Sequence, residues 1–266
     1  MSAMLAVPAV SVLSVRGATK RFGAVTALDG VDLDLYRGEV LALLGDNGAG
    51  KSTLIKCCSG ALRLDSGTIS MDGADVTIHS PRDAQALGIE TVYQDLALFD
   101  NLSPIDNFYA GRELAGPTWV PRSLQILRRR RMKAATAEVL ERLQVVIPDL
   151  DGSVGLMSGG QRQAVAVSRA AAFASKVVIL DEPTAALGVA QTEQVLALVR
   201  RLADSGTAVL IISHNLADVF EVADYINVLY LGTMVAQLET KNTTYDEVVG
   251  WITGSKIKDP AVVEGV

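Results

Sequence analysis

The sequence predicts an α/β protein with a mostly parallel sheet, and three observations support this prediction. Apolar runs of strand length alternate with longer segments whose apolar residues recur at helical spacing, as in parallel α/β folds. One apolar run leads into a glycine-rich turn and another into a pair of acids, both suited to a site at strand ends. The length of 266 residues suits one large domain, or a core domain with a smaller lobe.

Short strands are predicted at the start of the chain. "LSVRGATKRF" (13–22) and "VDLDLY" (31–36) are alternating or β-branched, and "RGEVLALLG" (37–45) is an apolar run that ends in glycine. Helix formers extend from Lys51 to Cys58, and "SGTISMDGADV" (66–76) predicts a small hairpin. These segments predict a β-rich beginning followed by the first strand-to-helix unit.

The middle of the chain changes in character. "SPRDAQALG" (80–88) predicts a helix capped by Ser80 and followed by the strand "IETVYQ" (89–94). Prolines then punctuate residues 95–154, and "RMKAATAEVLERLQV" (131–145) carries apolar residues at helical spacing. This composition predicts an inserted helical lobe.

Strands and helices alternate again in the second half. A helix is predicted to begin at Ser158, followed by the strand "VVIL" (177–180) and a helix over 190–206 that is closed by glycine. The strand "AVLIISH" (208–214) and the hairpin "YINVLYLGTMVAQLE" (225–239) complete the pattern. The chain has no internal repeat and is predicted to be a single domain over 1–266: core and β lobe at about 11–94 and 155–245, helical lobe at about 95–154, and a short C-terminal helix or tail at about 246–266.

Composition excludes several classes of protein. A net charge of -6 and a pI near 5.0 argue against nucleic acid as the main partner, because phosphate binding needs a basic face. The two cysteines are adjacent, which is the spacing of neither a disulfide framework nor a zinc site and indicates a reducing compartment. No apolar run approaches the roughly 20 residues that cross a bilayer. The N-terminus has no basic residue before its apolar part and is interrupted by Pro8, so it predicts a loose leader into the first strand and no secretory signal.

A phosphate-binding motif lies between an apolar strand and a helix. "GDNGAGKST" (45–53) fits the pattern G-x-x-x-x-G-K-[ST], in which glycines turn backbone N–H groups toward phosphate oxygens. Lys51 is expected to reach the β- and γ-phosphates, and the Ser52 hydroxyl to ligate Mg²⁺. A glycine-rich turn with a chance lysine is the alternative, and the flanking strand and helix disfavour it. The residues predicted to hold ATP or GTP are Gly45, Asp46, Asn47, Gly48, Ala49, Gly50, Lys51, Ser52 and Thr53.

Two acids follow the later strand in "VVILDEPTAALG" (177–188). Asp181 is predicted to hold the magnesium shell, and Glu182 to orient or deprotonate the water that attacks the γ-phosphate. Without the phosphate motif, an Asp-Glu pair after a strand is usually a helix start or a solvated turn. With that motif present, the pair predicts a P-loop nucleotidase.

"MSGGQRQAVAVSRA" (157–170) resembles the signature motif of the ATP-binding cassette (ABC) ATPases, which other P-loop enzymes lack. Ser158 and the backbone N–H groups of Gly159 and Gly160 open a helix and can form a second anion site. The resemblance implies that Ser158 to Gln161 close on the γ-phosphate of an ATP held by a second copy of the chain. A plain helix cap is the alternative reading of these residues.

Three further positions match the same family. The resemblance implies that Gln94 touches Mg²⁺ and the water, that His214 contacts the γ-phosphate, and that Phe22 stacks on adenine. The alternatives are a structural glutamine at a strand end, a surface histidine and a core phenylalanine. Lys51, Gln94, Glu182 and His214 are therefore the predicted catalytic residues, and Ser52, Gln94 and Asp181 the predicted magnesium ligands.

The resemblance implies a P-loop NTPase (RecA-like) core with an N-terminal antiparallel β lobe and an inserted helical lobe. "TVYQDLALFDNLSPIDNFYAGRE" and "LDEPTAALGVAQT" look like the cassettes of ribose, xylose and fructose importers. The implied activity is Mg²⁺-dependent ATP hydrolysis coupled to transport. The implied partners are two membrane permease subunits, indirectly an extracytoplasmic sugar-binding protein, and a second copy of the chain, with no nucleic acid. The implied location is peripheral, on the cytoplasmic face of the inner membrane.

Two other functions compete with sugar import. A soluble cassette acting on nucleic acid or ribosomes is disfavoured, because its usual coiled coil or tandem cassettes are missing; the basic "RRRRMK" (128–133) is instead predicted to be a solvated helix start, facing lipid headgroups or a loop of a membrane subunit. A regulatory cassette that binds ATP without hydrolysing it is disfavoured by the presence of Glu182 and His214.

The sequence departs from the family at two positions. Met157 replaces the usual leucine before the signature serine, and is expected to be neutral because its volume is similar. Gly188 replaces an aspartate that, in the family, lies in a loop linking the two ATP sites across the dimer. The role of that aspartate is therefore not carried over to Gly188.

Overall fold

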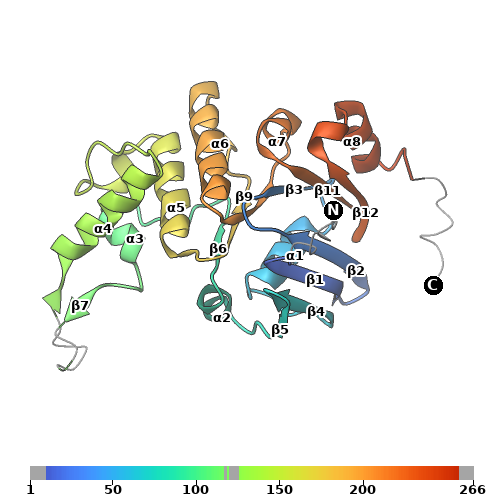
Figure 1. The fold of residues 1–266 in the computed structure, drawn as a ribbon, viewed down its shortest axis with the longest axis horizontal. Helices are drawn as coiled ribbons and strands as arrows, with labels where there is room; N and C mark the ends of the chain where they lie inside the picture. The colour runs from blue at the N-terminus through green and yellow to red at the C-terminus, as the bar shows by residue number, and fades with distance from the viewer. Residues whose placement is uncertain (1–9, 117–118, 120–125, 258–266) are drawn as a thin grey trace, which may run out of the picture.

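The structure is a computed structural model that describes residues 10–116, 119 and 126–257 (Figure 1). Two sheets and their covering helices form the right-hand part of the view, and a helical region lies at the left end. The predicted leader up to residue 9 and the end of the predicted C-terminal tail, residues 258–266, lie outside the described residues.

The larger sheet has six strands in the order β12-β11-β3-β10-β9-β6. All neighbours in it are parallel except β11 and β12, which form an antiparallel hairpin. This confirms the predicted mostly parallel sheet. The strands are β3 (Val40–Leu44), β6 (Ile89–Val92), β9 (Val177–Asp181), β10 (Ala208–Ile212), β11 (Tyr225–Tyr230) and β12 (Thr233–Glu239).

The second sheet has the order β2-β1-β4-β5 and is antiparallel throughout, which confirms the predicted β lobe. Its strands are β1 (Leu13–Phe22), β2 (Val25–Leu35), β4 (Ser66–Met71) and β5 (Ala74–Val76). Strand β2 begins at Val25, whereas the sequence predicted a strand that begins only at residue 31. Residues 25–30 lack a regular alternation, because the pairing of β1 with β2 shifts register here and Gly30 has a φ of +62°.

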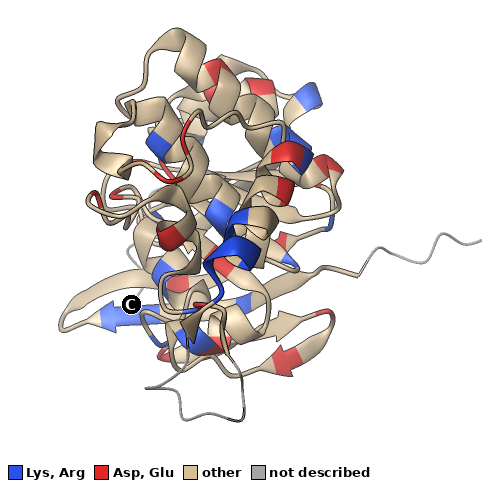
Figure 2. Cartoon of the chain, turned by 90° about the vertical axis from the view of Figure 1, so that its left-hand side faces the viewer, with Lys and Arg blue, Asp and Glu red and all other residues tan. Residues whose placement is uncertain are grey.

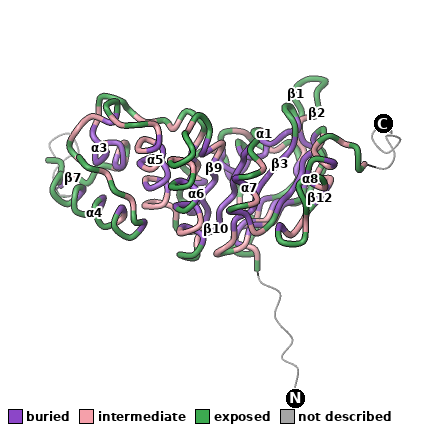
Figure 3. Tube along the Cα trace, turned by 90° about the horizontal axis from the view of Figure 1, so that it is seen from above, coloured by how far each residue is buried: buried purple, intermediate pink, exposed green. Residues whose placement is uncertain are grey.

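Successive side chains of a strand point to opposite faces of the sheet, so alternate residues of the central strands pack into two different cores. Leu41 and Leu43 of β3 face a core shared with the β lobe and α1 (Lys51–Cys58). Val40, Ala42 and Leu44 face the opposite core, under α5 (Gly159–Phe173), α6 (Val189–Asp204), α7 (Leu216–Val222) and α8 (Tyr245–Ile252). Figure 3 shows the buried chain running through the middle of the molecule along β3, β9 and β10.

Helix caps explain where several helices begin. The Ser80 side chain accepts a hydrogen bond from the Asp83 backbone N–H at the start of α2 (Pro81–Ala86), as predicted. Helix α7 was not predicted from the sequence, although the Asn215 side chain caps it by accepting a hydrogen bond from the Ala217 N–H at 3.0 Å. That helix is too short for its apolar spacing to stand out in the sequence.

The helical region contains α3 (Pro104–Tyr109), the short strands β7 (Ala115–Gly116) and β8 (Ile126–Leu127), α4 (Arg129–Arg142) and a 3₁₀ turn at Val154–Leu156. It has a core of its own formed by Ile105, Phe108, Tyr109, Met132, Leu140 and Val165. Val165 belongs to α5, whose neighbouring residues Ala166 and Val167 pack against the larger sheet. Helix α5 therefore joins the two parts, and the boundary of the lobe at residue 154 stays a prediction.

The basic segment 128–133 lies at the start of α4. Arg129 pairs with Asp106 at 2.6 Å, and Lys133 pairs with Asp151. Figure 2 shows basic and acidic segments interspersed on this face. Because neighbouring acids offset part of the positive charge, this face is not a uniformly basic surface of the kind that nucleic acid requires.

Both cysteines lie in the last turn of α1 and are buried. Burial raises the pKa of the Cys57 thiol to about 11 and that of the Cys58 thiol to about 12. Both thiols are therefore almost entirely protonated near neutral pH, and only the thiolate reacts. We expect neither cysteine to react with iodoacetamide over minutes in the native chain, and both to react in guanidinium chloride, as counted by mass spectrometry. Rapid native labelling of either one would contradict this burial.

Candidate nucleotide site

The carboxyl ends of β3, β10, β9 and β6 lie at one edge of the larger sheet, because these adjacent strands are parallel. A cavity of about 310 Å³ opens there. Ligands of open α/β sheets bind at this edge. Of the predicted site residues it is lined by Asn47, Gly48, Ala49, Gly50, Lys51, Ser52, Thr53, Gln94, Asp181, Glu182 and His214.

The glycine-rich turn brings Lys51 into this cavity as the first residue of α1. The Lys51 side chain is 7% exposed, and its Nζ donates to the carbonyl oxygens of Gly45 at 2.7 Å and Asp46 at 3.0 Å. Burial lowers the pKa of Lys51, while the nearby carboxylates of Glu182, Asp46 and Asp181 act in the opposite direction. The carbonyl groups of Gly45 and Asp46 therefore fix the position of the lysine ammonium, although neither residue lines the cavity.

Glycine is required at Gly50 for two reasons. Its φ is +106°, a conformation that other residues rarely adopt. A Cβ there would lie 2.4 Å from the carbonyl oxygen of Ala27, on β2. The β lobe thus presses directly against the turn that precedes α1.

Asp181 is the last residue of β9, and Glu182 follows it in a left-handed conformation with φ +52°. The Glu182 N–H donates to the Ile212 carbonyl oxygen at 2.9 Å, which ties the residue to the end of β10. A non-glycine residue in this conformation is uncommon and strained, and such residues cluster at functional sites. Burial raises the pKa of both carboxyl groups.

The Glu182 carboxylate faces His214. Its Oε2 accepts from the His214 backbone N–H at 3.3 Å, and its Oε1 lies 3.2 Å from His214 Nε2. That approach is close enough for an ion pair but is not aligned as a hydrogen bond, so the buried Oε1 has no hydrogen-bond donor among the described residues. Such an orphaned oxygen in a polar cavity suits a water or a ligand.

The oxygen donors of the cavity suit Mg²⁺. The Ser52 hydroxyl, the Gln94 side chain and the Asp181 carboxylate all line it, and hard oxygen ligands of this kind, few of them charged, are typical of magnesium held together with nucleotide phosphates. Together with the orphaned Oε1 of Glu182, this donor set fits a magnesium-nucleotide complex.

Phe22 and the residues 158–161 lie outside this cavity. Phe22 ends β1 with 47% of its surface exposed. Ser158 caps α5, since its Oγ accepts from the Gln161 N–H at 3.3 Å and Gln161 Oε1 accepts from the Ser158 N–H at 2.9 Å. Ser158, Gly160 and Gln161 line a different cavity, of about 620 Å³, between α5 and α6. Their predicted roles, and that of Gly159 beside them, stay predictions.

Ala27 and Ile212 also line the nucleotide cavity, although neither was predicted from the sequence. Both side chains are apolar and belong to no recognisable sequence motif. Ala27 comes from the β lobe and Ile212 ends β10, so only their positions in the fold bring them to the site.

Gly188 immediately precedes α6 with φ −77° and ψ 164°, and a Cβ added there would meet nothing within 4 Å. An aspartate therefore fits, and as a helix cap it stabilises. We expect Gly188→Asp to fold and to raise the free energy of unfolding by about 0.3 kcal/mol. Gly206→Asp is the control, because its φ of +91° makes the same change unfavourable. A lower melting temperature for Gly188→Asp than for the unaltered chain would contradict the open geometry.

Three comparisons place the chain among known proteins. The ABC transporter family model matches residues 28–185. The fructose import ATP-binding protein of Rhizobium meliloti is 48% identical over 92% of this chain and 95% of its own length. The xylose/arabinose import ATP-binding protein of Sulfolobus acidocaldarius is 45% identical over 91% and 93%. A ribose import ATP-binding protein of Rubrobacter xylanophilus is 42% identical, but the chain spans only 48% of its length.

A solved structure agrees with these sequence matches. The crystal structure of a nucleotide-free ATP-binding cassette from an ABC transporter superimposes with a TM-score of 0.75 and 27% identity, covering 96% of this chain and 98% of the other. Within the described residues, no helix has both the length and the apolar character that a bilayer crossing demands.

Proposed function

Because the chain belongs to the ABC transporter family, we propose that it is the ATP-binding and ATP-hydrolysing subunit of an importer for a monosaccharide of the fructose, xylose or ribose type. The observation that carries the proposed chemistry is the convergence of Lys51, Glu182 and His214 in one cavity. The full-length similarity to the fructose and xylose/arabinose import proteins supports the substrate class.

Each residue of the cavity has a role in this proposal. The backbone N–H groups around Gly48 and the Lys51 ammonium bind the phosphates. Lys51 is buried, so little water competes with this interaction. Ser52, Asp181 and Gln94 would hold Mg²⁺, which would supply positive charge to neutralise the phosphates. The orphaned Oε1 of Glu182 orients the attacking water and accepts its proton.

His214 contacts the γ-phosphate in the same proposal. Its Nε2 lies 3.2 Å from Glu182 Oε1, so one imidazole edge can position the catalytic carboxylate while the His214 side chain remains 57% exposed. Phe22 is proposed to stack on adenine from the half-exposed end of β1.

The proposed working unit contains two copies of the chain. Ser158, Gly160 and Gln161 line a cavity separate from the one that holds Lys51, which supports a site completed by the signature residues of a second copy. The pair docks on two membrane permease subunits near Gln94, at the cytoplasmic face of the membrane. The extracytoplasmic sugar-binding protein contacts only the permeases.

Reconstitution tests the proposal. The chain is co-expressed with candidate sugar-permease subunits, and ATP hydrolysis and uptake of radiolabelled ribose, xylose and fructose are measured in proteoliposomes. We expect the permeases to stimulate hydrolysis and one of the three sugars to accumulate. Stimulation by RNA or ribosomes without stimulation by permeases would instead support the nucleic-acid alternative. A single-turnover measurement without phosphate release would support the regulatory alternative.

A further inference from the structure

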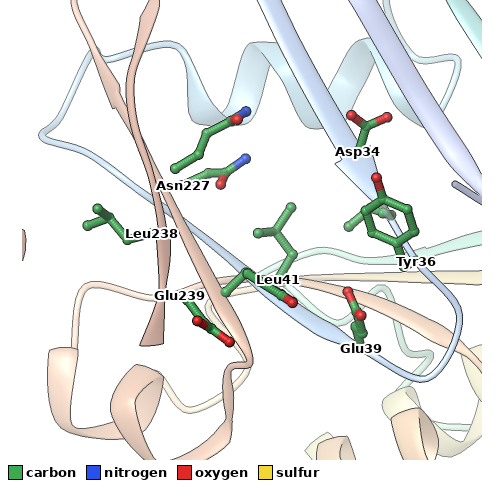
Figure 4. A pocket seen from close by; sticks show the side chains of 10 residues that line it. Asp34, Tyr36, Glu39, Leu41, Asn227, Leu238 and Glu239 are labelled. Carbon is green, nitrogen blue, oxygen red and sulfur yellow. The ribbon is translucent and has the colours of Figure 1, made fainter. Parts of the chain in front are cut away.

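A second cavity, of about 370 Å³, lies at the opposite end of β3 from the nucleotide site (Figure 4). Glu39, directly before β3, and Leu41 near its beginning contribute to the lining, whereas the phosphate-binding turn follows the end of the strand. Tyr225 and Asn227 come from the start of β11, the parallel neighbour of β3. The volume falls within the range of about 300–1,000 Å³ typical of small-molecule sites.

One wall of this cavity holds an amide that is free to bind a ligand. Asn227 is only 4% exposed as a residue and its side chain hydrogen-bonds to no described residue, but its amide atoms are not sealed from solvent. Residues two apart on a strand face the same side, so Asn227 lies on the Tyr225 face of β11, and Figure 4 shows its amide directed into the cavity. The Asn227 amide, with its donor and acceptor both unused by the described residues, can therefore hydrogen-bond to a molecule that enters the cavity.

The cavity also carries an excess negative charge. Asp34 is paired with Arg16 at 2.8 Å, and Glu239 with Lys241 at 2.5 Å. Glu39 has no cation within ion-pair distance among the described residues. Burial raises the pKa of the Glu39 carboxyl, and the nearby Asp224 adds to this effect. Among the acids that line the cavity, Asp34 and Glu239 have a cationic partner, whereas Glu39 has none among the described residues.

The remaining walls suit an organic cation. The rings of Tyr36 and Tyr225 line the cavity beside Glu39, and cations bind favourably over tyrosine faces. Leu41 and Leu238 supply an apolar surface. An anionic ligand is disfavoured by the unpaired carboxylate.

We propose that the cavity bounded by Tyr36, Glu39, Tyr225 and Asn227 binds a small organic ammonium compound. The ammonium group pairs with Glu39 between the tyrosine rings. The apolar body of the ligand packs on Leu41, and a hydroxyl or amide on the ligand hydrogen-bonds to the Asn227 amide. This site is independent of the nucleotide cavity.

Tyramine and tyrosol test the proposal as a matched pair, because they differ only by an amine in place of a hydroxyl. Binding to the full chain is measured by isothermal titration calorimetry at pH 7. We expect saturable binding of tyramine and about fivefold weaker binding of tyrosol, the upper end of what one partly exposed ion pair supplies. Glu39→Gln should weaken tyramine binding by a similar factor. Glu138→Gln, the same change on the exposed face of α4, should not alter it.

Three outcomes overturn the proposal: no saturable binding of tyramine, equal affinities for tyramine and tyrosol, or an unchanged affinity in Glu39→Gln. Retained ATP binding shows that each variant is folded. The comparison of the two ligands on the unaltered chain decides the matter even when Glu39→Gln fails to fold. Asn227→Leu adds an independent test, since loss of the amide should weaken both ligands.

Discussion

Glu182→Gln is expected to bind ATP as tightly as the unaltered chain and to hydrolyse it roughly 10²–10⁴ times more slowly, the usual effect of removing a general base. The substitution keeps the shape of the side chain and one acceptor for the His214 N–H, which lies 3.3 Å from Oε2. It removes the negative charge that orients and deprotonates the water. The rate loss corresponds to about 3–5 kcal/mol of activation free energy.

The same variant should be no less stable than the unaltered chain without nucleotide. Burial raises the pKa of Glu182, so the folded chain disfavours the ionised carboxylate. A group with a raised carboxyl pKa makes the fold less stable as pH rises from its unfolded pKa through its folded one. A neutral amide removes this effect at pH 7.

Nucleotide binding by fluorescence, single-turnover hydrolysis and thermal unfolding measure these three expectations. Glu193→Gln, on the exposed face of α6, is the control and should match the unaltered chain in all of them. Hydrolysis by Glu182→Gln within a few-fold of the unaltered rate would falsify the assignment of the base.

Gly50→Ala is expected to weaken nucleotide binding by about 100-fold or more and to lower the free energy of unfolding by about 3 kcal/mol, from left-handed strain and overpacking together. The new Cβ would lie 2.4 Å from the Ala27 carbonyl oxygen and 3.0 Å from Leu28 Cδ2, so either the turn or β2 has to move. Movement of the turn displaces Lys51, the next residue, and the N–H groups at the start of α1.

Gly206→Ala separates strain from collision. Gly206 has a similar φ of +91°, but a Cβ there meets nothing within 4 Å. It should lose only about 1–2 kcal/mol, from the left-handed conformation alone, and retain nucleotide binding. Equal losses of stability in the two variants would show that contact with Ala27 does not constrain the phosphate-binding turn. Denaturant titration and nucleotide binding measure both variants.

Much of the nucleotide site could be predicted because its chemistry is local in the sequence. The turn from Gly45 to Thr53 is continuous, and Asp181 and Glu182 are adjacent at the end of one apolar strand. Glycines, a lysine and an acid pair at fixed spacing are sufficient to identify the phosphate and metal chemistry. The parallel order of the strands then places these segments at one edge of the sheet.

Other features could not be predicted, because no local pattern encodes them. Ala27 limits the space behind Gly50 only because the β lobe packs against the turn. Helix α7 depends on the cap at Asn215 and on packing against the larger sheet more than on its own apolar spacing. The register of β2 is set by its partner β1, which extends the strand beyond its alternating part.

The sequence by itself determined the α/β class, the order of most strands and helices along the chain, and the phosphate-binding residues, because each depends on spacing within a few consecutive residues. Only the tertiary structure decided that Glu182 keeps a buried oxygen free of any described hydrogen-bond donor beside His214, and that signature residues such as Ser158 lie in a cavity apart from Lys51. It alone brought Glu39 and Asn227 to one cavity, because strands distant in sequence become neighbours only when the sheet forms.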